Sequence, residues 1–582
     1  MVRSLSILLA LTALAPHIVV AAEIVLDSPM DGDPSFELPG TVKTLSPELK
    51  ELWFRVLDGP ESELTMRAAE AIAAVRRDGF DDMNDATPHL TRVLAKQDLT
   101  LPVRLSIARA LVALDARQAA PELHRQAQRG ERELRQVIDP ALAEWRFEPA
   151  REEWLENLED EATPYELLRL AVRCLGTLRE PAASSRLQTL AQSAETPATI
   201  RLEAARAIGN IESDGLEEFA AKLAADMSPR GIVDRLVAVS VLRQHRSDRT
   251  TEILKELALD DEPTVAAKAL QWLLETDPAL VLPLTEKVLA NGDANVRRLG
   301  AQALVEVPSP EGVASLGPLL DDPHPDVRRY VRDSLFTLAA QPELDDPVRE
   351  AGMQALGLDS WRALEQASLL LGALDHEVAA DRLLVLLEQP RPEVMVASAW
   401  ALRRLALPDT LAPMLEFAKR QTERIEKDPA IAGANEQVAQ IFQAFGQMTY
   451  MPADALMRKF VPKSAVLGEV SRTAAIWALG HLHAGRPDAA LVSELESRIQ
   501  DVASMPPEVE PVRGMSAITL GRMEAKDALS TLRMYDVPSG AAEFVGAASN
   551  WAITRMTGEV YPKANARIIS DSGWFLEPLP AK

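Results

Sequence analysis

The chain has 582 residues, of which 47% are hydrophobic and only 4% aromatic, and its formal net charge is −25 at pH 7. The excess of 87 acidic over 62 basic residues excludes a broad nucleic-acid surface, because phosphate binding requires clustered positive charge. The single cysteine, Cys174, excludes an internal disulfide framework and a cysteine-based zinc site.

Residues 1–22 have the pattern of a signal peptide. Arg3 is followed by the mostly apolar residues 5–20, and Ala21-Ala22 supplies the small residues that signal peptidase requires. A membrane anchor is the alternative, but Pro16 interrupts the apolar stretch well short of the ~20 residues that a span needs. The sequence therefore predicts cleavage after Ala22 and an exported protein that does not insert into the membrane. Export without disulfides favours a bacterial periplasm, with secretion as the alternative.

Residues 23–46 are predicted to form an extended arm, since they are rich in residues that disfavour helices: Asp27, Pro29, Gly32, Pro34, Pro39 and Gly40. Residues 47–556 then repeat a pattern of about 31–34 residues. If a recurring arginine such as Arg297 is position zero, small or apolar residues follow at positions +4, +6 and +7. About fifteen copies fit this frame, with these residues at position zero: Arg67, Arg104, Arg135, Leu168, Arg201, Arg235, Ala266, Arg297, Arg328, Glu365, Met395, Val438, Arg472, Arg513 and Gly546.

Each copy contains two helical patterns separated by acidic residues and proline, as in residues 260–263, 321–325 and 345–347. A short acidic side chain accepts hydrogen bonds from exposed helix amides, and proline is tolerated in the first helical turn. No window alternates with a period of two, so strands are expected to be essentially absent. The sequence thus predicts an all-α solenoid of about fifteen stacked helix pairs, each pair burying its apolar face against its neighbours.

The repeat unit resembles HEAT repeats, specifically the bacterial type related to phycobilisome-lyase HEAT-like proteins. Residues 322–329 (DPHPDVRR) are similar to the first half of that unit, and residues 512–521 (VRGMSAITLG) to its second half. The resemblance covers almost the whole chain after the arm and implies a HEAT-like superhelix. It implies little about activity.

Three segments depart from the repeat. Residues 421–436 form an irregular insertion, and residues 500–511 form an acidic, proline-rich loop. Residues 557–582 are predicted to be a capping tail whose aromatic residues, Trp574 and Phe575, cover the exposed core of the last repeat.

Few residues suggest chemistry. His481 and His483 offer two metal ligands, but no third ligand is near in the sequence, so exposed loop residues at a helix end are expected instead. Four neighbouring residues could bind a cation but are expected to cap helices instead: Asp321, Asp322, His324 and Asp326. Cys174 falls on the apolar face and is expected in the core. No catalytic residue, cofactor site or metal site is therefore assigned.

The residues of this chain do not support two enzymatic activities that are found among HEAT-like proteins. The resemblance to HEAT-like deoxyhypusine hydroxylases implies several His-Glu pairs that bind two irons, but this chain has one such pair, His376-Glu377. A bilin lyase is also unsupported, because no pigment-handling group of residues is present and Cys174 is not placed for one. Neither activity is predicted.

Position +5 of each repeat is expected to point into the groove of the solenoid, because it lies opposite the core-facing positions on a helix. In the first half of the chain this position holds Arg109, Arg173 and Arg206, and in the last third it holds Trp400, Trp477 and Trp551. The arginines suit carboxylate recognition, and the tryptophans suit apolar side chains or sugar faces. The alternative is structural: the arginines pair with acidic neighbours and the tryptophans are buried between helices.

The sequence therefore favours a non-enzymatic exported scaffold that binds a protein or peptide partner on its concave face. The alternative is an enzyme or enzyme subunit, metal-assisted or associated with an oxidoreductase, whose site is assembled from distant repeats. No cofactor and no nucleic-acid partner is expected. The sequence does not determine the oligomeric state.

Overall fold

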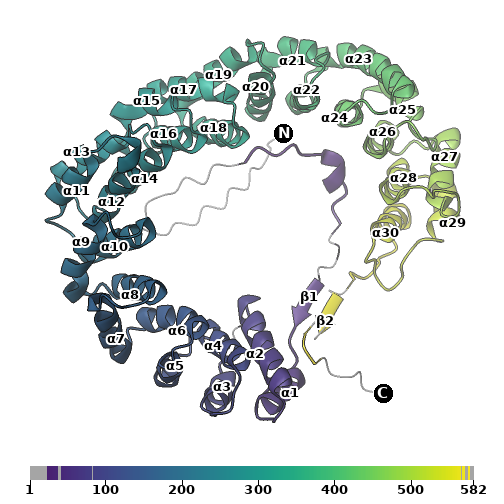
Figure 1. Ribbon diagram of the computed structural model, residues 1–582. Coiled ribbons are helices and arrows are strands. Elements are labelled where there is room, and N and C mark those ends of the chain that lie inside the picture. Colours follow the sequence, from purple (N-terminus) through teal and green to yellow (C-terminus); the bar gives the residue numbers. More distant parts are fainter. Residues whose placement is uncertain are drawn as a thin grey trace. The chain divides into compact units, whose positions relative to one another are not determined.

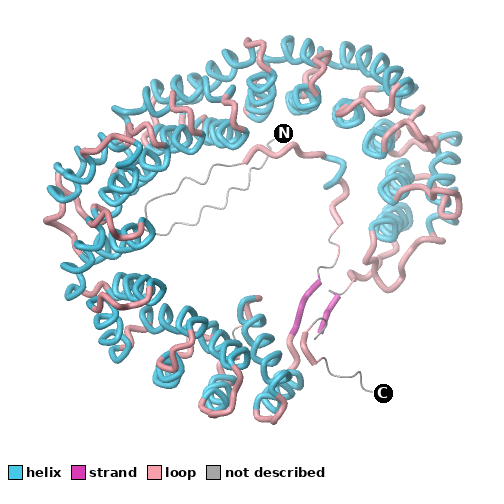
Figure 2. Tube along the Cα trace, viewed as in Figure 1, coloured by secondary structure: helices cyan, strands magenta, loops and turns pink. Residues whose placement is uncertain are grey.

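The computed structural model describes residues 23–36, 38, 41–80, 83–564, 567–570 and 574–576. The predicted signal peptide lies outside these residues. The described chain forms 30 α-helices joined mostly by short loops, so the predicted all-α solenoid is confirmed (Figure 2). It divides into two compact units. Among the described residues, those from 41 to 288 and from 567 to 576 form the amino-terminal repeat unit, and those from 23 to 38 and from 289 to 564 form the carboxy-terminal repeat unit.

The helices of the amino-terminal repeat unit alternate between two rows (Figure 1). They are α1 (Pro47–Leu57), α2 (Ser62–Arg77), α3 (Ala86–Leu94), α4 (Leu101–Ala113), α5 (Ala120–Ala127), α6 (Arg132–Glu144), α7 (Glu148–Glu159), α8 (Tyr165–Leu178), α9 (Ser184–Gln192), α10 (Ala198–Ile211), α11 (Glu217–Ala224), α12 (Ile232–Val241), α13 (Asp248–Leu257) and α14 (Pro263–Thr276). The short helix α15 (Thr285–Leu289) lies at the division between the units.

The carboxy-terminal repeat unit continues the alternation and begins with a single helical turn in the arm, η1 (Pro29–Gly32). Its helices are α16 (Ala294–Glu306), α17 (Pro310–Leu316), α18 (Pro325–Leu338), α19 (Pro342–Leu356), α20 (Trp361–Ala373), α21 (Ala380–Leu386), α22 (Pro392–Leu405), α23 (Pro408–Lys427), α24 (Ala434–Gln447), α25 (Asp454–Arg458), α26 (Glu469–Leu482), α27 (Ala489–Gln500), α28 (Glu510–Met523), α29 (Leu529–Leu532) and α30 (Phe544–Thr557).

Every predicted position-zero residue lies in an even-numbered helix, and an odd-numbered helix precedes each of them. Within each unit, the even-numbered helices form the inner row and the odd-numbered helices the outer row (Figure 1). The frame found in the sequence therefore matches the inner row of helices.

Acidic residues begin several helices as predicted. The Asp293 carboxylate accepts a hydrogen bond from the backbone N–H of Val296 at the start of α16, and the Glu262 carboxylate accepts one from Thr264 at the start of α14. The break expected at residues 345–347 is wrong, because Pro347 lies inside α19. The missing backbone hydrogen bond is outweighed there by the apolar face that this helix buries, which includes Leu344, Val348 and Ala351.

Glycines at position +7 or +8 allow neighbouring inner helices to approach closely. A Cβ atom added to Gly446 in α24 would lie 2.7 Å from Cζ3 of Trp477 and 2.8 Å from the Cα of Ala478, both in α26. Gly372 lies in the same way against Trp400, and Gly521 against Trp551. Each predicted groove tryptophan therefore packs its ring edge over a glycine of the preceding inner helix.

The position-zero arginines tie one repeat to the next. In the clearest case, the Arg297 guanidinium pairs with both carboxylate oxygens of Asp322, at Nε–Oδ2 and Nη2–Oδ1 distances of 2.6 and 2.7 Å. Asp322 also accepts a hydrogen bond from the backbone N–H of His324, whose ring accepts one from Asp326. Of the predicted caps, Asp322 thus forms a buried ion pair between repeats, and His324 is the N-cap residue of α18.

Two short strands differ from the expectation of an almost strand-free chain. β1 (Thr41–Thr44) and β2 (Arg567–Ser570) pair in parallel within the amino-terminal repeat unit, with Thr41 opposite Arg567. Four residues are too few to give a recognisable period of two. In the same unit, Trp574 packs edge-on against Trp53 and Phe80. It therefore covers the first repeat, whereas the sequence predicted that it would cover the last one.

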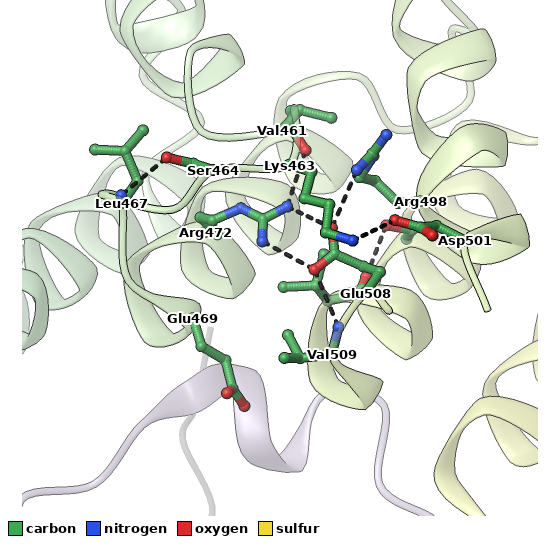
Figure 3. Close-up of polar contacts among 12 residues, drawn as sticks. Val461, Lys463, Ser464, Leu467, Glu469, Arg472, Arg498, Asp501, Glu508 and Val509 are labelled. Atoms are coloured by element: carbon green, nitrogen blue, oxygen red, sulfur yellow. Dashed lines mark hydrogen bonds and ion pairs between the residues drawn. The ribbon is translucent and has the colours of Figure 1, made fainter. Parts of the chain in front are cut away.

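The two irregular segments of the carboxy-terminal unit have different structures. Residues 421–427 extend the outer helix α23 to 20 residues. The proline-rich loop at residues 500–511 is fixed by Glu508, which receives hydrogen bonds from Arg472 at 2.9 and 2.7 Å and from Arg498 at 3.2 Å (Figure 3). Lys463 adds an ion pair with Asp501 at 2.8 Å.

Candidate functional site

The three predicted groove arginines are exposed on the inner row of the amino-terminal repeat unit. Arg109 lies on α4, Arg173 on α8 and Arg206 on α10. Arg206 makes a 3.3 Å contact with Glu203 on its own helix. An exposed pair of this kind contributes little to stability, so the three guanidinium groups are accessible cations on a strongly acidic protein.

Arg109 lines an open pocket of about 900 Å³. Arg67 and Arg77 of α2 line the same pocket, and Trp574 and Phe575 form its aromatic side. A smaller pocket of about 270 Å³ includes Arg173 and Arg169 together with Glu166 and Glu203. The first pocket therefore combines three guanidinium groups with an apolar surface, a combination that suits a carboxylate carried on an apolar body.

Positive charge continues beyond Arg206 along the inner row. Burial, and then the neighbouring Arg206 and Arg243, lower the pKa of the Lys268 ammonium on α14. Burial is the larger cause of this shift, and repulsion by the two guanidinium groups adds to it, because like charges disfavour one another's ionised forms. An anionic partner would lower that repulsion.

The tryptophan row is arranged differently, because the arm covers it. Trp400 on α22 and Trp477 on α26 are each only 2% exposed. The arm, residues 23–36, runs along the inner row of the carboxy-terminal repeat unit (Figure 1). Both indole nitrogens donate hydrogen bonds to it: Trp400 to the Asp27 carboxylate at 2.8 Å and Trp477 to the Asp33 carbonyl oxygen at 3.2 Å.

Asp27 is the first anchor of the arm. Arg403 of α22 contacts the Asp27 carboxylate at 2.5 Å and its backbone carbonyl oxygen at 3.0 Å. Burial by itself would raise the pKa of Asp27, but Arg403 and the Trp400 indole outweigh it and hold that pKa below its ordinary value. The Arg403 side chain is buried, and burial lowers the pKa of its guanidinium.

Asp33 is the second anchor. Arg522 of α28 contacts the Asp33 carboxylate at 2.7 Å and donates to its carbonyl oxygen at 2.6 Å. Nε2 of His481 lies 2.9 Å from the other carboxylate oxygen. Burial, and then Arg522, lower the pKa of His481. Asp33 is thus held by three side chains from two neighbouring inner helices.

Backbone groups of the arm are also recognised. The Asp333 carboxylate of α18 accepts a hydrogen bond from the backbone N–H of Ile24 at 3.1 Å, and Arg332 donates to the Ile24 carbonyl oxygen at 3.3 Å. Between the two anchors, Oε1 of Gln443 on α24 accepts from the Ser28 hydroxyl at 2.9 Å and from the Met30 N–H at 3.4 Å. The contacts therefore extend over successive inner helices.

The end of the arm reaches the last repeat. Phe36 packs edge-on against Phe544 at the start of α30, with a centroid distance of 5.8 Å. Trp551, also on α30, is half-buried, and the Arg555 guanidinium lies 5.7 Å from its ring centroid. Of the three predicted tryptophans, two contact the arm directly by hydrogen bonds.

The remaining candidates have structural surroundings. The expectation that His481 and His483 lie in an exposed loop is wrong: His481 lies in the last turn of α26, and His483 is its C-cap residue, with Nε2 2.6 Å from Asp454. Among the described residues no group of three or more metal-ligating side chains is present. Cys174 is buried as predicted, and burial raises the pKa of its thiol well above its usual value. None of the described helices is long and apolar enough to cross a membrane.

Sequence reasoning missed the arm's binding residues. Arg403 and Arg522, which hold the two aspartates, lie three or four residues after the positions assigned to the groove. The signal present in the sequence was an acidic arm carrying Asp27 and Asp33, together with Arg403 and Arg522 on the predicted inner helices.

The repeats and the fold have known counterparts. Residues 250–335 match the family model of HEAT repeats. No curated protein matches the chain. The fold is similar to that of Kap95p in the structure in which it induces the switch loops of RanGDP to adopt the GTP-bound conformation, with a TM-score of 0.54 and 14% identity over 88% of this chain and 72% of that chain.

A structure of yeast importin-beta, also Kap95p, covers the same shares at 14% identity with a TM-score of 0.48. At 14% identity, the similarity is one of fold alone. It is based on the first of the two structures, which has the higher TM-score. The described chain is therefore a HEAT-type helical solenoid in architecture.

Proposed function

We propose that this protein is a non-enzymatic scaffold that binds a protein or peptide partner on its inner row of helices. The observation that carries the proposal is the contact between the inner row and the arm, in which side chains of five inner helices hold the arm through Asp27, Ser28, Asp33 and backbone groups. A surface that binds its own extended segment has the chemistry to bind a partner's. Kap95p, whose fold is similar, binds Ran, and this also supports the proposal.

The exposed arginine row of the amino-terminal repeat unit is the proposed docking surface for the partner. Arg109, Arg173 and Arg206 present guanidinium groups on a protein of net charge −25, and guanidinium groups pair with carboxylates through two hydrogen bonds. The partner segment that fits this row is acidic and extended. No covering segment contacts this row among the described residues apart from Trp574 and Phe575 beside Arg109.

The triple variant Arg109→Gln, Arg173→Gln and Arg206→Gln tests the proposal. Partner capture from the native host should fall at least ~10-fold, since each desolvated charge pair is worth ~1–3 kcal/mol. The matched control changes exposed arginines of the outer row, Arg92, Arg125 and Arg249, to Gln. Equal loss in both variants would indicate a general charge effect and contradict the proposed surface.

We further propose that the protein belongs to the bacterial phycobilisome-lyase HEAT-like type and is exported to the periplasm, with secretion as the alternative. The signal-peptide pattern of residues 1–22 supports export. Mass spectrometry of the protein from its native host should give an N-terminus at or near Glu23, and an intact Met1 would contradict export. Metal analysis of the same sample addresses the alternative, because stoichiometric iron or zinc would favour an enzyme.

A further inference from the structure

The arm contacts the carboxy-terminal repeat unit in a way that defines a pattern of recognition. Most of the arm atoms involved are backbone atoms, namely the N–H and C=O of Ile24, the C=O of Asp27, the N–H of Met30 and the C=O of Asp33. These groups occur in every peptide. The side-chain contacts of the arm are made by the Ser28 hydroxyl, the Phe36 ring and the Asp27 and Asp33 carboxylates, and each of the two carboxylates is bound by a buried arginine.

The spacing of the two aspartates matches the spacing of the inner helices. Asp27 is bound from α22, and Asp33 is bound from α26 and α28, so one inner helix, α24, lies between α22 and α26. Packed helices lie ~8–10 Å apart, which places α26 ~16–20 Å from α22. Six fully extended residues would span ~20 Å, and the 3-10 turn at Pro29–Gly32, which rises ~2 Å per residue, reduces the span from Asp27 to Asp33 to ~15 Å, close to the lower end of the helix spacing. The helix spacing therefore selects two carboxylates about six residues apart.

The arginines require an acidic occupant. Arg403 and Arg522 are both buried, and a buried guanidinium without a carboxylate leaves an uncompensated charge. Trp400 and Trp477 likewise need an acceptor for their indole N–H groups. An extended segment without the two carboxylates would satisfy the backbone contacts and leave both arginines unpaired.

We infer that the inner row from α18 to α28 is a peptide-binding groove that selects an extended segment with two carboxylates six residues apart, and that residues 23–36 are its resident occupant. A partner segment with the same spacing takes the place of the arm. The inference rests on the proposed function only in that the protein binds partners; the groove is separate from the arginine row, and its test does not use that row.

Because the arm belongs to the same chain, it competes with a free peptide at an effective concentration of ~mM. Weakening the arm should therefore open the groove to a peptide added in solution. The full-length variant Asp27→Asn with Asp33→Asn removes both anchors and leaves the groove residues unchanged. The probe is a fluorescein-labelled synthetic peptide with the sequence of residues 23–36, and binding is measured by fluorescence anisotropy.

The labelled peptide should bind the arm variant at least ~10-fold more tightly than it binds the wild-type protein. A peptide with both aspartates replaced by asparagine, and one with a residue deleted between them, should each bind ~10-fold more weakly. Adding Arg403→Gln and Arg522→Gln to the arm variant should abolish binding. A folded arm variant that does not bind the peptide, or binding that ignores these changes, would overturn the inference.

If the arm variant fails to fold, hydrogen exchange of the wild-type protein tests whether the arm occupies the groove and whether an acidic peptide displaces it. The backbone amides of Ile24 and Met30 donate to groove side chains, so they should exchange slowly. Excess unlabelled peptide should speed their exchange, whereas the asparagine peptide should not. Fast exchange of both amides in the protein alone, or exchange that the acidic peptide does not change, would overturn the inference. Retained partner capture through the arginine row in either case would leave the proposed function standing.

Discussion

The indole nitrogen of Trp477 donates a hydrogen bond to the backbone carbonyl oxygen of Asp33, 444 residues earlier in the chain. The same ring packs over Gly446 of the preceding inner helix and below the Arg522 guanidinium, whose centre lies 5.7 Å from the ring centroid. Trp477 therefore belongs both to the packing between repeats and to the surface that holds the arm.

Substitutions at Trp477 should separate these two roles. Trp477→Ala is expected to cost ~3–5 kcal/mol of stability, as for other buried aromatic truncations. Trp477→Phe keeps most of the ring and removes the N–H donor, so we expect a loss nearer ~1 kcal/mol together with faster proteolysis of the arm. Thermal unfolding and limited proteolysis measure the two effects. An alanine variant as stable as the wild type would show that the ring is not packed between the helices.

Gly446→Ala should be destabilising although alanine is the better helix former. The added methyl group would lie 2.7 Å from Cζ3 of Trp477 and 2.8 Å from the Cα of Ala478, so the two inner helices would have to separate. Overpacking of this kind costs ~1–3 kcal/mol, which outweighs the ~1 kcal/mol gained in helix propensity. Gly292→Ala is the matched control, since nothing lies within 4 Å of a Cβ at that position. A rise in melting temperature for Gly446→Ala would contradict the close packing.

The repeat frame could be predicted from the sequence because it depends on local periodicity. Arg297 and Arg472, chosen as position zero from the pattern alone, both lie in inner helices. Each binds an acidic residue of the loop that precedes the next inner helix. Position +5 was also well placed, since Asp333, Trp400, Gln443 and Trp477 all contact the arm.

What fills the groove could not be predicted in the same way. The hydrogen bonds between the arm and the inner helices join residues that are 308 to 489 positions apart in the sequence, and many of them use backbone atoms that leave no trace in residue type. The burial of Trp400 and Trp477 follows from this contact together with their packing over Gly372 and Gly446. The position of Trp574 against Trp53 was missed for a similar reason, because a single aromatic residue in an irregular tail does not indicate which repeat it covers.

Asp139 provides a pH-dependent prediction. This carboxyl group on α6 is only 1% exposed, and burial raises its pKa to about 6 although Arg135 acts in the opposite direction. The pKa of Asp139 in the folded protein lies above the ordinary value of 3.8, so the folded state binds the proton more tightly than the unfolded state does. The stability that this group contributes is present below pH ~4 and is lost as pH rises through about 6.

Replacing Asp139 with asparagine should remove that loss. The free energy of unfolding of Asp139→Asn minus that of the wild type should rise between pH 4 and pH 7 by up to ~3 kcal/mol, since one pKa unit corresponds to ~1.4 kcal/mol. Arg135 keeps a partner in the variant, because it also contacts Glu153 at 2.7 Å. Urea unfolding at several pH values measures the difference, and the exposed Asp98→Asn serves as control. A difference that does not change with pH would place the pKa of Asp139 at its ordinary value.

The buried pair between Arg472 and Glu508 should determine whether the proline-rich loop stays in place. Glu508→Ala leaves the buried Arg472 guanidinium without its carboxylate, so we expect a loss of ~3–5 kcal/mol in urea unfolding. The loop should also become sensitive to protease near Met505, which is 96% exposed.

The double variant Arg472→Met with Glu508→Leu removes both charges and fills a similar volume. It should recover most of the lost stability, because a buried pair contributes little beyond avoiding an unpaired charge. Lys463→Ala removes the outer ion pair with Asp501 and two exposed hydrogen bonds to Ser504 and Pro506 but leaves the buried pair intact, so it should cost less, ~1 kcal/mol. If the double variant were as unstable as Glu508→Ala, the loss would come from the packing of the loop and not from the unpaired guanidinium.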